Sequence, residues 1–213
     1  MNNESDAVKT TAVQANSQAS SNGSALLDIK DMRVWYHTRR GEAKAVDGVN
    51  LVIQRNEVFG IAGESGCGKS TLVKGLLRLT KLPAHIESGE AVFYRAAGNA
   101  GRMGVDLLNI DLAEMRRLRW CHLAYIPQSA MNVLNPVMRI ENQMIDAILE
   151  HSDMARSEAR REIARQLEMV GLEPSVARMY PHELSGGMKQ RVAIASAVTL
   201  SPELIFADEP TTA

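Results

Sequence analysis

A glycine-rich stretch at residues 63–70, GESGCGKS, contains the residue types of this sequence that are best arranged for chemistry. Glycines let consecutive backbone N–H groups curl around phosphate oxygens, and the N-terminus of a following helix favours the same negative charge. Lys69 would reach the β- and γ-phosphates of a nucleotide, and the hydroxyl of Ser70 would ligate Mg²⁺. The predicted nucleotide-binding residues of this loop are Gly63, Glu64, Ser65, Gly66, Cys67, Gly68, Lys69, Ser70 and Thr71.

Two acidic residues end an apolar run, LIFADE, at residues 204–209. An apolar run of this length suits a buried strand, which delivers the residues that follow it to the carboxyl end of a sheet, beside a phosphate loop. In that setting we expect Asp208 to hold Mg²⁺. We expect Glu209 to be the base that orients and polarises an attacking water molecule.

A second small-residue turn occurs in LSGGMKQR, at residues 184–191. Ser185, Gly186 and Gly187 open a predicted helix and so provide a second anion site of the same physical kind. One nucleotide does not need two such sites from one chain. Two copies placed head to tail would use both, because each would lend its turn to the nucleotide on the other's phosphate loop.

These three motifs together resemble the ABC ATPase family, in which the Ser-Gly-Gly turn acts across a dimer. The resemblance implies an α/β fold of the P-loop NTPase, ABC-ATPase type. This fold has a mostly parallel core sheet, an N-terminal antiparallel β-subdomain and a small helical subdomain, here at about residues 129–184. The implied cofactors are ATP and Mg²⁺.

The same resemblance implies roles for two further residues. Gln128 matches the family's Q-loop, which would sense Mg²⁺ and the γ-phosphate, so Ser70, Gln128 and Asp208 form the expected Mg²⁺ set. Tyr36 occupies the position of the aromatic residue that stacks on adenine. Strand alternation places Trp35 on the opposite face, and Trp35 is the alternative if the register differs by one.

Longer strings, TRRGEAKAVDGVNL, QSAMNVLNPVMRI and YPHELSGGMKQR, resemble the dipeptide and oligopeptide importer ATPases. This subgroup implies contact with integral membrane permease subunits through residues near 131–139, pairing with a second, non-identical ABC ATPase, and indirect work with an extracytoplasmic solute-binding protein. The expected location is cytoplasmic, on the inner face of the cell membrane. Related members carry nickel or oligosaccharides, so the cargo stays open. An ABC-type ATPase of DNA repair or translation is the alternative function.

Composition restricts the other classes. The chain of 213 residues carries 24 Lys and Arg against 25 Asp and Glu, a net charge of -1 that gives no reason to expect nucleic-acid binding. No apolar run reaches the length of about 18 residues that a membrane-spanning helix needs. The two cysteines, Cys67 and Cys121, lack the spacing of a disulfide framework or a zinc site. Residues 1–25 are expected to be a disordered tail, and 26–213 a nucleotide-binding domain.

Periodicity predicts the elements that must position these motifs. Two strands at 26–36 and 45–54 are expected to form an antiparallel opening. Further strands are expected at 58–63 (VFGIAG), 89–94, 122–126 and 204–207, and a loop at 95–106. Helices are expected at 70–79, at 159–170, where Gly171 and Pro174 would end the helix, and at 187–200.

The family pattern continues beyond Ala213 with an aspartate-bearing loop, a further strand and a histidine that contacts the γ-phosphate. The resemblance therefore implies that the present chain lacks parts needed for turnover. On that basis we expect the chain alone to bind Mg-ATP and to show no ATPase activity above background. A nucleotide-binding fragment without turnover is thus a further alternative.

Overall fold

The computed structural model describes residues 25–210, except for residue 40 and residues 97–100 and 129–132. The predicted tail, 1–25, lies outside the described residues except for Ala25, and so do 131 and 132 of the predicted permease-contact segment. The chain forms two compact units, Met1–Met115 and Arg116–Ala213, and each is described by itself.

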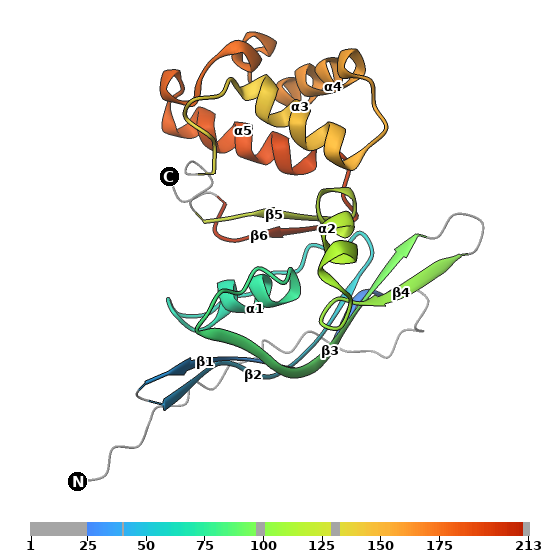
Figure 1. The fold of residues 1–213 in the computed structure, drawn as a ribbon, viewed down its shortest axis with the longest axis vertical. Helices are drawn as coiled ribbons and strands as arrows, with labels where there is room; N and C mark the ends of the chain where they lie inside the picture. Colours follow the sequence, from blue (N-terminus) through green and yellow to red (C-terminus); the bar gives the residue numbers. More distant parts are fainter. Residues whose placement is uncertain (1–24, 40, 97–100, 129–132, 211–213) are drawn as a thin grey trace. The chain divides into compact units, whose positions relative to one another are not determined.

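The first unit is built on a four-stranded antiparallel sheet with the order β2-β1-β3-β4 (Figure 1). Its strands are β1 (Ala25–Thr38), β2 (Gly41–Gln54), β3 (Ala84–Ala96) and β4 (Arg102–Asp106). The predicted antiparallel pairing of the first two strands is confirmed. Strand β1 is central, because β2 and β3 pair with its two edges.

Strand β4 corrects the prediction of a continuous loop at 95–106. Residues 102–106 pair antiparallel with β3, and Val105 lies opposite the fully buried Phe93. The glycines of this segment favour a loop locally, but a cross-strand apolar partner compensates for that tendency. The local sequence cannot reveal this partner.

The core of the first unit lies between the sheet and helix α1 (Lys69–Leu76). The strand residues Leu27, Ile29, Met32 and Val34 are at most 1% exposed. A Cβ atom at Gly75 would come within 2.6 Å of the end of the Met32 side chain and 3.1 Å of Val34, so these side chains would have to shift for a larger residue to allow the same approach of α1 to β1. This contact fixes the helix that begins at the phosphate loop.

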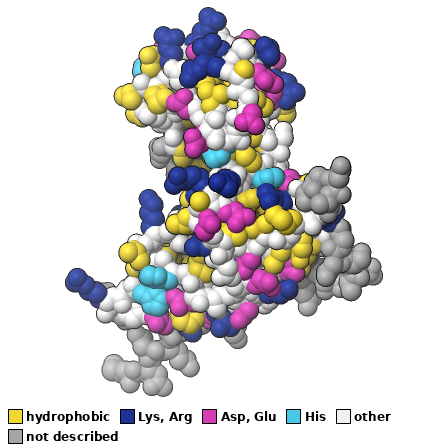
Figure 2. Space-filling model, turned by 45° about the vertical axis from the view of Figure 1, so that its right-hand side comes forward, with side chains coloured by type: hydrophobic (Ala, Val, Ile, Leu, Met, Phe, Trp, Pro, Cys, Tyr) yellow, Lys and Arg dark blue, Asp and Glu magenta, His cyan; other side chains and the backbone are white. Residues whose placement is uncertain are grey.

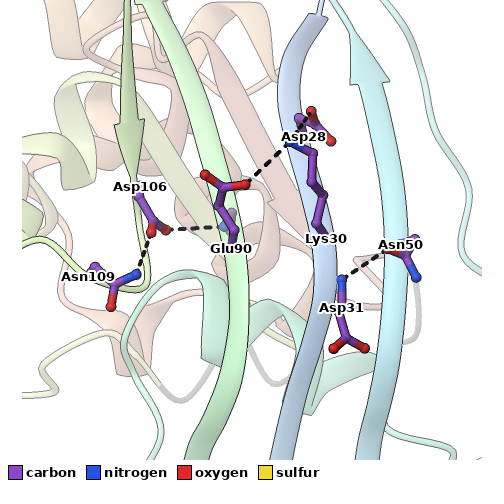
Figure 3. A network of polar contacts seen from close by, with 8 residues as sticks. Asp28, Lys30, Asp31, Asn50, Glu90, Asp106 and Asn109 are labelled. Atoms are coloured by element: carbon purple, nitrogen blue, oxygen red, sulfur yellow. Dashed lines mark hydrogen bonds and ion pairs between the residues drawn. The ribbon is translucent and has the colours of Figure 1, made fainter.

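A network of polar side chains links the strands of this sheet (Figure 3). Lys30 of β1 reaches Glu90 of β3 at 3.3 Å, and the backbone N–H of Asp31 donates to Asn50 of β2 at 3.0 Å. The carboxylate of Asp106 accepts from the backbone N–H of Ala91 at 3.1 Å. The first two contacts link β1 to both of its neighbours, and the third links β3 to β4.

The second unit combines a parallel strand pair with helices (Figure 1). Strands β5 (Leu123–Ile126) and β6 (Leu204–Ala207) pair in parallel, as expected for the buried runs at 122–126 and 204–207. The helices are α3 (Ile140–His151), α4 (Arg156–Met169) and α5 (Gly186–Val198), with short 3-10 turns η3 (Pro174–Arg178) and η4 (Pro181–Glu183). Helix α2 (Leu112–Cys121) begins in the first unit and ends in the second, and it has non-helical backbone angles at Arg119 and Trp120.

The second unit has its own core. Its buried apolar residues are Ile140, Met144, Ile145, Ile148, Ala159, Ile163, Leu167, Leu172, Val176, Leu184, Val192 and Ala195. Gly171 has a φ of 70° directly after α4, the left-handed conformation that ends a helix and that its sequence predicts. Among the described helices, none has the length and apolar character needed to cross a membrane.

The predicted strand at 58–63 is not formed. These residues belong to neither described sheet, and Val58 and Ile61 are 101% and 45% exposed. An apolar run only shows that a segment is suited to burial, because a strand also needs hydrogen-bond partners on neighbouring strands. The prediction of a buried parallel strand before the phosphate loop is therefore wrong for this structure.

Candidate nucleotide-binding site

The phosphate loop has the backbone conformation that its glycines predict. Gly66 and Gly68 have φ values of 81° and 99°, a region that residues with a Cβ atom rarely adopt. A Cβ at Gly68 would also lie 2.2 Å from the carbonyl oxygen of Ala45 in β2, so the loop passes too close to the sheet for any side chain. Glycine at this position is required both by conformation and by space.

The start of α1 leaves its backbone N–H groups available. Gly68 is the N-cap of the helix and makes no side-chain cap hydrogen bond, and no acidic residue lies in the first turn. Exposed N–H groups at a helix N-terminus attract anions. Lys69 adds a positive charge at this position, and its ammonium donates to the carbonyl oxygens of Gly63 at 2.7 Å and Glu64 at 2.9 Å.

Tyr36 lies beside the first turn of α1. Its hydroxyl is 3.1 Å from Oγ1 of Thr71, in a hydrogen bond in which either oxygen can be the donor. Its cross-strand partners are Ala43 on β2 and Ala84 on β3, so both flanking side chains are small. The adjacent Trp35 is paired differently, with the ammonium of Lys44 lying 4.3 Å from the centre of its ring.

The carboxylates predicted for metal binding and catalysis directly follow β6. The backbone N–H of Asp208 continues the β5–β6 ladder by donating to the carbonyl oxygen of Ile126 at 2.9 Å. Glu209 has a φ of 50° and accepts a hydrogen bond of 2.8 Å from Nε2 of Gln128. The structure thus brings together Gln128 and Glu209, two predicted site residues separated by 81 positions.

Tyr125 is a residue of this group that the sequence motifs do not identify. Its hydroxyl donates to Oδ2 of Asp208 at 3.4 Å. Burial, followed by the negative charge of Asp208 and the hydrogen bond to it, raises the pKa of Tyr125 to about 12, so the phenol stays neutral and can donate. Strand β5 pairs in parallel with β6 and places Tyr125 opposite Phe206, two residues before Asp208. Tyr125 could have been identified from the sequence only if this strand pairing had been inferred.

The Ser-Gly-Gly turn opens helix α5 as predicted. Ser185 is the N-cap, and its hydroxyl accepts a hydrogen bond from the backbone N–H of Met188 at 3.3 Å. Ser185, Gly186 and Gly187 are exposed, and a Cβ at Gly187 would meet no atom within 4 Å. The turn is thus an open helix N-terminus in the second unit.

The predicted site residues fall into two groups. Tyr36 and the phosphate loop belong to the first unit, whereas Gln128, the carboxylates and the Ser-Gly-Gly turn belong to the second. Among the described residues, no cluster of three or more His, Cys, Asp or Glu side chains is placed to hold a metal ion. The donors predicted for Mg²⁺ are instead one carboxylate, one hydroxyl and one amide, all of which offer the oxygen ligands that this ion prefers.

The sequence profile of the ABC transporter family matches residues 46–212, which is most of the chain. The protein therefore belongs to the ABC transporter family. The oligopeptide transport ATP-binding protein OppD of Escherichia coli (strain K12) is 40% identical over 191 residues, which are 89% of this chain and 54% of OppD. The dipeptide transport ATP-binding protein DppD of Caldanaerobacter subterraneus subsp. tengcongensis is 38% identical over 192 residues, 89% of this chain and 56% of DppD. The chain spans about half the length of these curated relatives.

Solved structures agree with this assignment. The dimeric structure of MJ0796, a bacterial ABC transporter cassette, matches with a TM-score of 0.73 and 28% identity, over 87% of this chain and 74% of that chain. MJ0796 in a post-hydrolysis state bound to ADP and Pi matches with the same score and identity. These likenesses confirm the predicted ABC-ATPase fold.

Proposed function

We propose that this chain binds and hydrolyses Mg-ATP as the ATPase subunit of an ABC importer for dipeptides or oligopeptides. The observation that carries the proposal is the phosphate loop, in which the open space beside Gly66 and the uncapped start of α1 leave room and donors for phosphate oxygens. Membership of the ABC transporter family supports the nucleotide, and the names of the relatives support the cargo.

The proposed binding step divides the nucleotide among three kinds of contact. Tyr36 stacks on the adenine ring, the N–H groups of residues 63–71 bind phosphate oxygens, and Lys69 neutralises part of the phosphate charge. Ser70, Gln128 and Asp208 would hold Mg²⁺ through oxygen ligands, and the ion would supply positive charge to offset that of the β- and γ-phosphates. Tyr125 holds the carboxylate of Asp208 by its hydrogen bond.

The proposed hydrolytic step uses Glu209 to orient the attacking water and accept its proton. The amide of Gln128 already contacts this carboxylate, so Gln128 is placed to influence the orientation of the base. In this proposal the Ser-Gly-Gly turn of each chain completes the site of a second ABC ATPase. The open N-terminus of α5 supports that role, because its first turn is exposed.

The proposed partners are integral membrane permease subunits, a second, non-identical ABC ATPase and, indirectly, an extracytoplasmic solute-binding protein. The proposed location is the inner face of the cell membrane. In the part of the predicted permease-contact segment that the structure describes, Val133 and Val137 are 59% and 79% exposed, as a docking surface requires. The face shown in Figure 2 carries both basic and acidic side chains, and the net charge of -1 supports a function without nucleic acid.

A binding and turnover experiment tests the proposal. Lys69→Ala should weaken Mg-ATP binding by about tenfold or more, the range for loss of charge-assisted hydrogen bonds. Lys74→Ala, at the exposed end of the same helix, is the matched control and should bind normally. Glu209→Gln should bind Mg-ATP and, in a version of the chain extended by the downstream segment of the family pattern, should lower phosphate release by about 100-fold or more. Phosphate release is measured with the partner ATPase and permease present. Equal binding by the two lysine variants would contradict the proposed site.

A further inference from the structure

We infer that the hydroxyl of Tyr36 positions Thr71 for binding a nucleotide phosphate, a role separate from that of the aromatic ring. This inference rests on the proposed Mg-ATP function. Its basis is the 3.1 Å hydrogen bond between the two hydroxyl oxygens, which joins a sheet residue to the first turn of α1. Tyrosine and phenylalanine are therefore not equivalent at position 36, although either ring can stack on a base.

Tyr36 is held in place from both sides. It lies on the central strand β1, opposite Ala43 of β2 and Ala84 of β3. The next residue, His37, donates its backbone N–H to the carbonyl oxygen of Pro83 at 2.9 Å, and its Nε2 lies 2.6 Å from Oε1 of Glu87. Because the backbone on both sides of Tyr36 is held by these contacts, its side chain can hold the start of α1 in position.

The hydrogen bond from Tyr36 holds helix α1 near its beginning. At its far end the helix is fixed by the close approach of Gly75 to Met32 and Val34. Thr71 lies one helical turn before Gly75, and Tyr36 lies two residues beyond Val34 on the same face of the strand. The N-cap Gly68 has no side chain to cap the helix, and the contact of Tyr36 with Thr71 adds a side-chain link between the first turn and the sheet.

The chemistry of the two hydroxyls allows one arrangement that leaves a donor for the ligand. A hydroxyl can accept hydrogen bonds and also donate one. When the phenol of Tyr36 donates to Thr71, the hydrogen of Thr71 is left for a phosphate oxygen at the start of the helix. Hydrogen bonds in such a chain strengthen one another. The ligand group recognised in this way is the phosphate of the nucleotide and not its base.

A double-mutant cycle in the full chain tests this inference, with Tyr36→Phe, Thr71→Val and both together. The affinities for Mg-ADP and for adenosine are measured by calorimetry, and the unfolding temperature is measured without nucleotide. Tyr36→Phe should weaken Mg-ADP binding about three- to tenfold, the range for loss of one hydrogen bond, and leave adenosine binding unchanged. Added to Thr71→Val, it should cause no further loss. Tyr94→Phe, a tyrosine of β3, is the matched control for removal of a phenolic hydroxyl.

Three results would overturn the inference. An unchanged Mg-ADP affinity in Tyr36→Phe, together with a lower unfolding temperature, would show a purely structural hydrogen bond. Equal losses for Mg-ADP and adenosine would place the effect at the base. Additive losses in the double variant would show that Tyr36 does not act through Thr71. Failure of the unaltered chain to bind Mg-ADP would instead contradict the proposed function, and the two failures are therefore distinguishable.

Discussion

His37 is a residue whose protonation depends on its neighbours. Its imidazole contacts Glu87 at 2.6 Å and Glu42 at 3.5 Å, and it meets the ring of His85 edge-on at a centroid distance of 5.0 Å. The hydrogen bond to Glu87, aided by the negative charges of Glu87 and Glu42, raises the pKa of His37 above 6.5, although partial desolvation opposes this. The charged imidazole therefore stabilises the folded state below about pH 6.5, and this contribution is lost as the pH rises through the raised pKa.

Glu87→Gln should lower the pKa of His37 towards the usual histidine range, because it removes the partner charge. An NMR titration of the His37 ring measures this pKa. Glu90→Gln is the matched control, since Glu90 is on the same strand but contacts Lys30. An unchanged His37 titration in Glu87→Gln would show that the contact is not maintained in solution.

At the scale of elements, the sequence-based prediction and the structure differ at residues 58–63, where a buried strand was predicted and none is formed. The structure leaves Val58 fully exposed, so Val58→Ser should change the free energy of unfolding by less than about 0.5 kcal/mol. Leu27, which is 0% exposed on β1, is the contrasting position, and Leu27→Ala should cost about 2–5 kcal/mol. Urea unfolding measures both. If Val58→Ser lowered the free energy of unfolding by about 2 kcal/mol or more, Val58 would be buried, as the predicted strand requires.

Elements with a strong local signal could be predicted from the sequence. The alternation in β1 and β2, the stripe and terminal glycine of α4 and the glycines of the phosphate loop each specify their conformation locally. Strand β4 and the absence of a strand at 58–63 depend on partners distant in the sequence, which periodicity does not report. The candidate site follows the same division: its motifs were visible, but the contacts of Tyr36 with Thr71 and of Tyr125 with Asp208 need the fold.

The whole molecule consists of two compact units, each with a buried core of its own. Units that have separate cores can unfold separately, in which case one denaturation curve contains two transitions. The chain has one tryptophan in each unit, Trp35 in the first and Trp120 in the second. The fluorescence of Trp120→Phe, which retains Trp35, therefore reports the unfolding of the first unit. The fluorescence of Trp35→Phe, which retains Trp120, reports the unfolding of the second.

Ile163→Ala tests this independence, because Ile163 is 1% exposed in the core of the second unit. The lost packing should cost about 2–5 kcal/mol and lower the midpoint of the Trp120 transition by about 1 M urea or more. The Trp35 transition should stay unchanged, since the core of the first unit is intact. Leu149→Ala, at a 37% exposed position of α3, is the matched control and should move neither transition by more than a small amount. Equal shifts of both transitions in Ile163→Ala would show instead that the two units unfold as one cooperative structure.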